Sequence, residues 1–284
     1  MGNEKEKKQS LKTESVSSIR LLKYLEGKAR NHVNFKMYSS LTSLKYRRNS
    51  EALFLSKGGN WNDVQDRNMF NPHYSNYVRF GACFSFSRSE SVAMWMLYGG
   101  TKREGIMVDF KQAHMKRILN EIESVDYGVW QAGGFLSKGK LNKKDFSLNL
   151  MDVLYISESQ DPQSYRVKRS DETVPAVNKK IIDHQTFIKK SDAWSYENEC
   201  RLIVSVPYNK IIGNGLINSI RISIPSIYDD LINERRIYMA PNFSGNMPKF
   251  QKSALTGGVD WNLCSDCDYP VIAASAMNGG KGNV

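Results

Sequence analysis

A short acidic motif in the second half of the chain is the first candidate for chemistry. It lies in Trp194–Val204, where Glu197, Glu199 and Arg201 occupy alternate positions. In a strand, alternate side chains project from one face, so we expect these three to share a face of a strand over Tyr196–Val206. A carboxylate held rigidly there can stabilise an oxocarbenium-like transition state when a glycosidic bond breaks. The ordinary alternative is a surface Glu199–Arg201 ion pair, worth less than ~1 kcal/mol.

A second candidate segment places two hydroxyls close together. In a strand over Ala82–Ser87, Ser85 and Ser87 project from one face and two phenylalanines from the other. A pair of hydroxyls facing a cleft suits a polar ligand such as a ribose. A structural role competes for the second serine, because Ser87–Glu90 has the pattern of a helix capping box with Ser87 as the N-cap.

A third segment could supply aromatic contacts. Trp95 and Tyr98 are three positions apart in a predicted helix over Glu90–Tyr98, so they lie on one helix face. Such a stripe either packs into the core or forms a platform for a flat cation such as nicotinamide.

An alternation of strands and helices positions these segments, which indicates an α+β fold. Strands are predicted over Val33–Tyr38, Glu51–Ser56, Ala82–Ser87, Gly105–Phe110, Val125–Trp130, Tyr196–Val206 and Ile217–Ile224. Helices are predicted over Ser18–Arg30, Leu41–Arg48, Glu90–Tyr98, Gln112–Ile122, Val174–Lys190 and Pro225–Arg235, and a helix with loops over Gln131–Ser170. We expect residues 1–17 to be a disordered lead-in, 18–274 a single catalytic domain and 275–284 a frayed tail.

Composition narrows the classes of protein and of partner. The chain has 284 residues, 40% of them hydrophobic, and a net charge of +11. Such charge favours a polyanion such as nucleic acid, although a solvated basic surface is equally compatible. The sequence shows neither an apolar run of ~20 residues nor a secretory leader, so we expect a cytoplasmic protein without membrane contact. The four cysteines and four histidines lack the spacing of a disulfide scaffold or a metal site, so neither is expected.

Several ordered motifs over Phe35–Val206 carry a family resemblance. They are Met37–Leu41, Leu53–Ser56 followed by Asn62 and Asp63, Cys83–Ser85, Met94–Tyr98, Gly105 before a strand, and Trp194–Arg201. In this order and spacing, the chain resembles a widespread bacterial family catalogued as a domain of unknown function (number two-nine-seven-one).

Two of the motifs also resemble those of ADP-ribosyltransferases. Phe84–Ser87 is similar to the aromatic-x-Ser-Thr-Ser strand of these enzymes, with Phe86 in the position of the threonine. Glu197–Ile203 is similar to their Glu-x-Glu motif leading into an apolar strand. The resemblance implies that Glu199 is catalytic and hydrogen-bonds the ribose next to nicotinamide. It implies that Glu197 positions or activates the acceptor.

The same resemblance implies an NAD site. Ser85 and Ser87 would support it, and Trp95 or Tyr98 would line the nicotinamide pocket. These enzymes carry an Arg or His on their first strand, whereas this chain has neither in Phe35–Ser39. Lys36 or Tyr38 would take that place, or Arg47 from the following helix.

The resemblance therefore implies an α+β fold with a split pair of mostly antiparallel sheets and flanking helices. We expect an NAD-dependent ADP-ribosyltransferase that modifies RNA, single-stranded DNA or protein. Because such an enzyme would harm its own cell, we expect a toxin or anti-phage effector restrained by an inhibitory protein partner. Two alternatives remain: a catalytically inactive module that binds a nucleotide or nucleic acid, and a metal-dependent nuclease using Glu197, Glu199 and Asp63.

Overall fold

The computed structural model describes residues 20–57, 76–98, 104–132, 134–158, 160–168, 173–179, 183, 186–211, 217–241, 243–244, 247 and 249–255. The predicted lead-in (1–17) and tail (275–284) lie outside these residues, as does Asp63. The chain divides into two compact units that interleave along the sequence. The first unit comprises Met1–Val33, Leu53–Phe86 and Gln112–Ser223, and the second comprises Asn34–Ala52, Ser87–Lys111 and Ile224–Val284.

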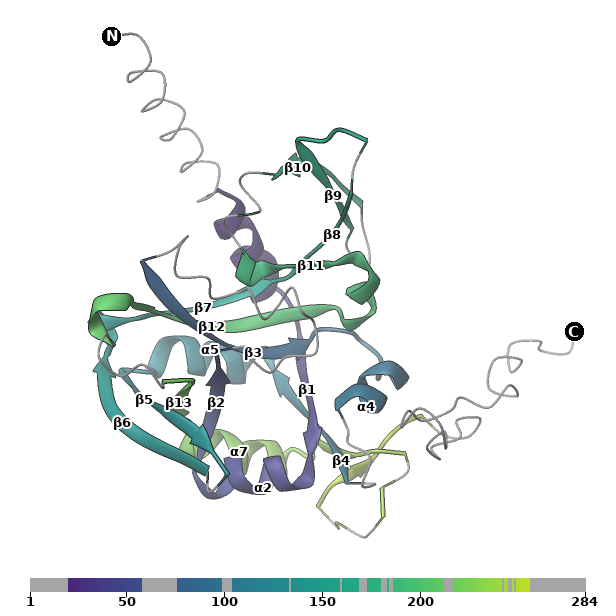
Figure 1. The fold of residues 1–284 in the computed structure, drawn as a ribbon. Coiled ribbons are helices and arrows are strands. Elements are labelled where there is room, and N and C mark those ends of the chain that lie inside the picture. The colour runs from purple at the N-terminus through teal and green to yellow at the C-terminus, as the bar shows by residue number, and fades with distance from the viewer. Residues whose placement is uncertain are drawn as a thin grey trace, which may run out of the picture. The chain divides into compact units, whose positions relative to one another are not determined.

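In the main sheet of the first unit, β12 pairs antiparallel with both β3 and β7, and β5 pairs antiparallel with β13 and β6. The order of this sheet is β7-β12-β3-β2-β13-β5-β6 (Figure 1). The strands are β2 (Ala52–Ser56), β3 (Tyr77–Ser85), β5 (Ser124–Gln131), β6 (Gly134–Asn142), β7 (Ser147–Asp152), β12 (Glu199–Pro207) and β13 (Ser219–Ser223). Six consecutive β12 residues, Glu199–Val204, are buried, which makes β12 a central strand of this unit.

A smaller sheet in the same unit has the order β10-β9-β8-β11. Its strands are β8 (Leu154–Glu158), β9 (Ser164–Lys168), β10 (Thr173–Asn178) and β11 (Lys189–Ser191). Four short 3₁₀ helices, η3 (Lys143–Asp145), η4 (Thr186–Ile188), η5 (Asp192–Glu197) and η6 (Tyr208–Lys210), lie between strands, and α5 is Gln112–Glu121. One apolar cluster joins Met151 of β7, Ile203 of β12, Ile156 of β8 and Leu25 of the helix at 20–30. The small sheet therefore packs against the β7–β12 part of the main sheet.

The second unit is a sheet of order β15-β14-β4-β1 with helices. Its elements are β1 (Asn34–Ser40), α2 (Leu41–Asn49), α4 (Val92–Tyr98), β4 (Gly105–Lys111), α7 (Pro225–Asn233), β14 (Ile237–Met239) and β15 (Gln251–Lys252). Ser40 caps α2 by accepting a hydrogen bond from the Ser43 amide (3.2 Å), and Pro225 occupies the first turn of α7. The core of this unit includes Tyr38, Trp95 and Met107.

The structure confirms the α+β class. Most predicted elements match the structure within a few residues, but two regions were predicted wrongly. Gln131–Ser170 forms strands β6 to β9 rather than a helix with loops, and Val174–Lys190 contains β10, η4 and β11 rather than a helix. Pro175 accounts for part of the second error, because proline disrupts a helix interior but is tolerated on an edge strand such as β10. No helix within the described ranges is long and apolar enough to cross a membrane.

Candidate functional site

The structure places Ser85 and Glu199 directly opposite each other on neighbouring strands. Strand β12 pairs with β3 so that Glu199 is the partner of Ser85, and Arg201 is the partner of Cys83. Directly opposite residues of an antiparallel pair share a face of the sheet. Ser85 and Glu199 are both buried. The two main motifs therefore meet at one end of β12, within the first unit.

The position of Glu197 differs from the prediction. Glu197 ends the 3₁₀ helix η5 rather than lying on the strand. The next residue, Asn198, adopts the left-handed conformation (φ 45°, ψ 57°), which asparagine tolerates better than most residues. This turn interrupts the alternation, so β12 begins at Glu199, and of the three charged residues only Glu199 and Arg201 share a face of the strand.

Four buried side chains nevertheless form one ionic cluster: Lys190, Glu197, Glu199 and Arg201. The Lys190 ammonium donates to Glu197 (2.5 Å) and to Glu199 (3.3 Å). The Arg201 guanidinium donates two hydrogen bonds to Glu199, from Nε to Oε1 (2.6 Å) and from Nη2 to Oε2 (3.2 Å). None of the four is more than 4% exposed. Two cations and two carboxylates balance, as buried charges require.

Neighbouring backbone and aromatic groups hold this ionic cluster in place. Lys190 on β11 is the register partner of Tyr155 on β8, and the Tyr155 hydroxyl accepts a hydrogen bond from the Glu199 amide (2.7 Å). Arg201 donates from Nη1 to the Phe187 carbonyl oxygen (3.1 Å). Lys190 also lies over the Trp194 ring, 4.8 Å from its centroid. The small sheet thus fixes the position of the charged groups on β12.

Electrostatics keep Glu199 ionised. Burial alone would raise the pKa of its carboxyl, but the charges of Arg201 and Lys190 outweigh burial and lower that pKa to about 2. The Cys83 thiol hydrogen-bonds the same carboxylate, and burial together with the Glu199 charge raises the pKa of Cys83. The site therefore presents a carboxylate beside a protonated thiol, which disfavours a cysteine nucleophile.

The lowered pKa predicts a pH dependence of stability. Since the folded pKa of about 2 lies below the ordinary glutamate pKa of 4.5, Glu199 stabilises the fold above pH ~4.5 and loses that contribution as pH falls toward 2. The contribution is on the order of 3 kcal/mol. Urea unfolding of the wild type and Glu199→Gln should show a difference in stability that is constant near neutral pH and shrinks below pH ~4.5. A difference that stays constant down to pH ~3 would contradict the ion pairing described here.

The other predicted site residues lie in the second unit, where they pack in its core or take part in the loop before α4. Trp95 is only 2% exposed, meets Tyr38 edge to face (centroids 5.0 Å apart) and donates from Nε1 to Glu90 (2.9 Å). Tyr98 packs against the same core cluster. The Tyr38 hydroxyl accepts a hydrogen bond from the Ser91 amide (3.2 Å), and burial raises its pKa. These contacts agree with the core alternative for this aromatic stripe.

The predicted capping box at Ser87 is wrong. Helix α4 begins at Val92, and Ser91 caps it by accepting a hydrogen bond from the Met94 amide (3.3 Å). The backbone carbonyls of Ser87 and Arg88 instead receive hydrogen bonds from the buried Lys36 ammonium, the second at 3.1 Å. Burial lowers the pKa of Lys36. In this structure Lys36 therefore anchors the loop before α4.

Sequence reasoning missed Lys190 and Tyr155, which complete the site. Both lie in regions whose elements were predicted wrongly, so no strand register could bring them toward Glu199. A further pair was missed on the opposite face of the sheet, where His32 hydrogen-bonds Asp152 (2.7 Å) and stacks on Phe86 (centroids 3.9 Å apart). The only signal available for Lys190 was its charge next to an apolar segment.

The comparisons with known proteins bear on the family alone. A family described as "Protein of unknown function (DUF2971)" matches residues 94–202. This match confirms the family resemblance, and its range includes Glu197, Glu199, Arg201, Lys190 and Tyr155. No curated protein and no solved structure matches the chain.

Proposed function

We propose that the protein is an NAD-dependent ADP-ribosyltransferase that acts through Glu199. The observation that supports this proposal is the pairing of Ser85 with Glu199 on adjacent strands, with the carboxylate rigidly held and ionised. These are the two residue types that the Ser-x-Ser and Glu-x-Glu resemblance assigns to the NAD site. An ionised, pre-positioned carboxylate is what an oxocarbenium-like transition state requires.

The proposed reaction breaks the bond between the nicotinamide nitrogen and the ribose carbon of NAD. The electron pair leaves with nicotinamide, which becomes neutral, and positive charge develops on the ribose. The Glu199 carboxylate stabilises that charge, and Ser85 supports the ribose side of the site. An acceptor atom then forms the new bond and loses its proton, and Glu197 assists that step. To contact the ribose, Glu199 gives up its long hydrogen bond with Lys190 (3.3 Å) and accepts one from the ribose instead, while its hydrogen bond with Arg201 remains.

We assign the acceptor to nucleic acid in preference to protein because of the net charge of +11. An exposed base is easier to reach in a single strand than in a duplex, which must first be unstacked. The proposal includes a cytoplasmic toxin or anti-phage role with an inhibitory protein partner. The contribution of Lys36, Tyr38, Ser87, Trp95 and Tyr98 to NAD binding stays a prediction.

Incubation of the full chain with labelled NAD and single-stranded RNA, single-stranded DNA or cell lysate tests this function. We expect nicotinamide release and label on the single strands, decreasing steeply as salt rises from ~50 to ~200 mM because bound phosphates release counterions. Label on protein alone would refute the nucleic-acid acceptor and keep the enzyme class. Absence of nicotinamide release under all these conditions would refute the enzyme class.

One observation favours a second candidate, a binding module without catalysis. Both carboxylate oxygens of Glu199 are already engaged by Arg201 and Lys190. Such a module would bind NAD or a related nucleotide without cleaving it, so binding without nicotinamide release distinguishes it. Within the described residues no cluster of three or more His, Cys, Asp or Glu side chains is arranged to hold a metal ion, and the nuclease alternative depends on Asp63, which lies outside them.

A further inference from the structure

A pocket of about 380 Å³ lies on the same face of β12 as Glu199 but toward the other end of the strand. Ile203 and Ser205 of the pocket wall are four and six positions beyond Glu199, which corresponds to about 13 and 20 Å along a strand. Arg201, which lies between Glu199 and Ile203 on this face, is fully buried. None of the four charged residues of the ionic cluster lines the pocket, and the size of the pocket is within the range of small-molecule sites.

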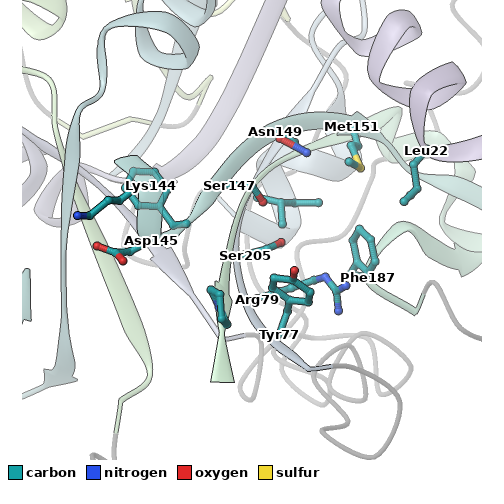
Figure 2. Close-up of a pocket in the computed structure, with 13 residues that line it drawn as sticks. Leu22, Tyr77, Arg79, Lys144, Asp145, Ser147, Asn149, Met151, Phe187 and Ser205 are labelled. Atoms are coloured by element: carbon teal, nitrogen blue, oxygen red, sulfur yellow. The ribbon is translucent and has the colours of Figure 1, made fainter. Parts of the chain in front are cut away.

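The charged side chains that line this pocket are two cations, Arg79 and Lys144, and one carboxylate, Asp145. Figure 2 shows Arg79 on one side and Lys144 with Asp145 on the other. Asp145 already pairs with the Lys210 ammonium (2.7 Å). Burial lowers the pKa of Arg79 to about 10, so it stays charged at neutral pH. Two cations in the lining, with a carboxylate that already pairs with Lys210, suit an anion.

The remaining lining suits a flat ring with polar edges. The Arg79 guanidinium lies over the Phe187 ring, 4.2 Å from its centroid, so Phe187 holds the planar group in the pocket wall. Met151, Ile203 and Leu22 add apolar surface. On neighbouring strands β7 and β12, Ser147 and Ser205 are register partners, and Asn149 follows on the same face. These three side chains offer hydroxyl and amide groups beside the apolar surface.

We propose that this pocket binds one phosphate-bearing nucleotide unit, either a free nucleoside monophosphate or a nucleotide of a single strand. Arg79 stacks on the base, and Lys144, which is exposed at the pocket, contacts the phosphate. The serine and asparagine side chains hydrogen-bond the sugar or base edge. This site requires no cleavage of NAD, so it stands independently of the proposed transferase activity.

Calorimetric titration of the full chain with AMP, adenosine and a short 5′-phosphorylated single strand at ~50 mM salt tests the proposal. We expect AMP to bind at least about tenfold more tightly than adenosine, because the phosphate adds charge-assisted hydrogen bonds. If the single strand binds more tightly than AMP, the natural ligand is a nucleotide of a nucleic acid. If AMP binds more tightly, the natural ligand is a free nucleotide. Either order supports the site. Failure of both to bind, or equal affinity for AMP and adenosine, would overturn it.

Substitutions locate the binding. Lys144→Gln should weaken AMP binding about tenfold and leave adenosine binding nearly unchanged, because it removes the phosphate contact. Arg79→Gln should weaken the binding of AMP and of adenosine, because it removes the cation that stacks on the base. Arg79→Lys keeps the charge and should recover part of the affinity, which separates charge from misfolding. Lys116→Gln on α5 is the matched control, since Lys116 is an exposed cation of the same unit outside the pocket. Equal affinities for the wild type, Arg79→Gln and Lys144→Gln would place AMP elsewhere and overturn the assignment.

Discussion

Glu199→Gln is expected to reduce nicotinamide release from NAD by at least about 100-fold. Glutamine keeps the size and most hydrogen bonds of the side chain but removes the charge that stabilises an oxocarbenium-like transition state. The measurement is single-turnover release of nicotinamide at saturating NAD, together with NAD affinity. We expect the rate to fall much more than the affinity, because the carboxylate acts in the transition state.

The design must separate loss of charge from loss of fold, since the ionic cluster is buried. Glu199→Gln alone leaves Lys190 and Arg201 facing one carboxylate. The double variant Lys190→Met/Glu199→Gln restores neutrality, with Glu197 and Arg201 remaining. It should unfold at a urea concentration closer to that of the wild type and stay inactive. If a folded Glu199→Gln protein released nicotinamide at a rate near that of the wild type, Glu199 would have no catalytic role.

Arg201→Met is expected to destabilise the protein by about 3–5 kcal/mol, because removing one partner leaves a buried charge incompletely compensated. Arg201 is fully buried and makes two hydrogen bonds to Glu199 and one to the Phe187 carbonyl. This loss is a large part of the stability of a typical domain, so the variant should unfold at much lower urea concentration.

The control for Arg201→Met is a less buried ion pair of the same unit. Arg221 on β13 pairs with Asp126 at 3.4 Å, and both side chains are about one-third exposed (34% and 28%). Arg221→Met should cost less than ~1 kcal/mol. The double variant Glu199→Gln/Arg201→Met should recover part of the loss caused by Arg201→Met. A cost for Arg201→Met no greater than that for Arg221→Met would show that the ionic cluster does not support the fold.

Local patterns in the sequence predicted much of the fold but only part of the candidate site. The apolar run after Glu199 predicted β12, and the cluster of Phe and Ser residues around Ser85 predicted the end of β3. Their pairing depends on strand register between segments far apart in the chain, which local periodicity does not encode. The resemblance to ADP-ribosyltransferases supplied the link between them.

Wrong predictions of local structure also limited how much of the candidate site could be predicted from the sequence. A single left-handed residue, Asn198, removed Glu197 from the strand, and alternation alone gives no warning of such a turn. Lys190 was assigned to a helix, so its approach to both glutamates could not be foreseen. The alternative of a surface Glu199–Arg201 pair identified the right partners but the wrong environment, because burial of these groups depends on the small sheet.

The interleaving of the two units has a practical consequence for truncated forms of the protein. The segment matched by the family model, residues 94–202, starts in α4 of the second unit and ends within β12 of the first. A fragment with these boundaries would lack all of β3, and with it Ser85 and one flank of β12. The exposed backbone amides and carbonyls along β12 would then be open to pairing with other chains. We therefore expect that fragment to aggregate on expression, and useful deletions to be confined to the ends of the chain.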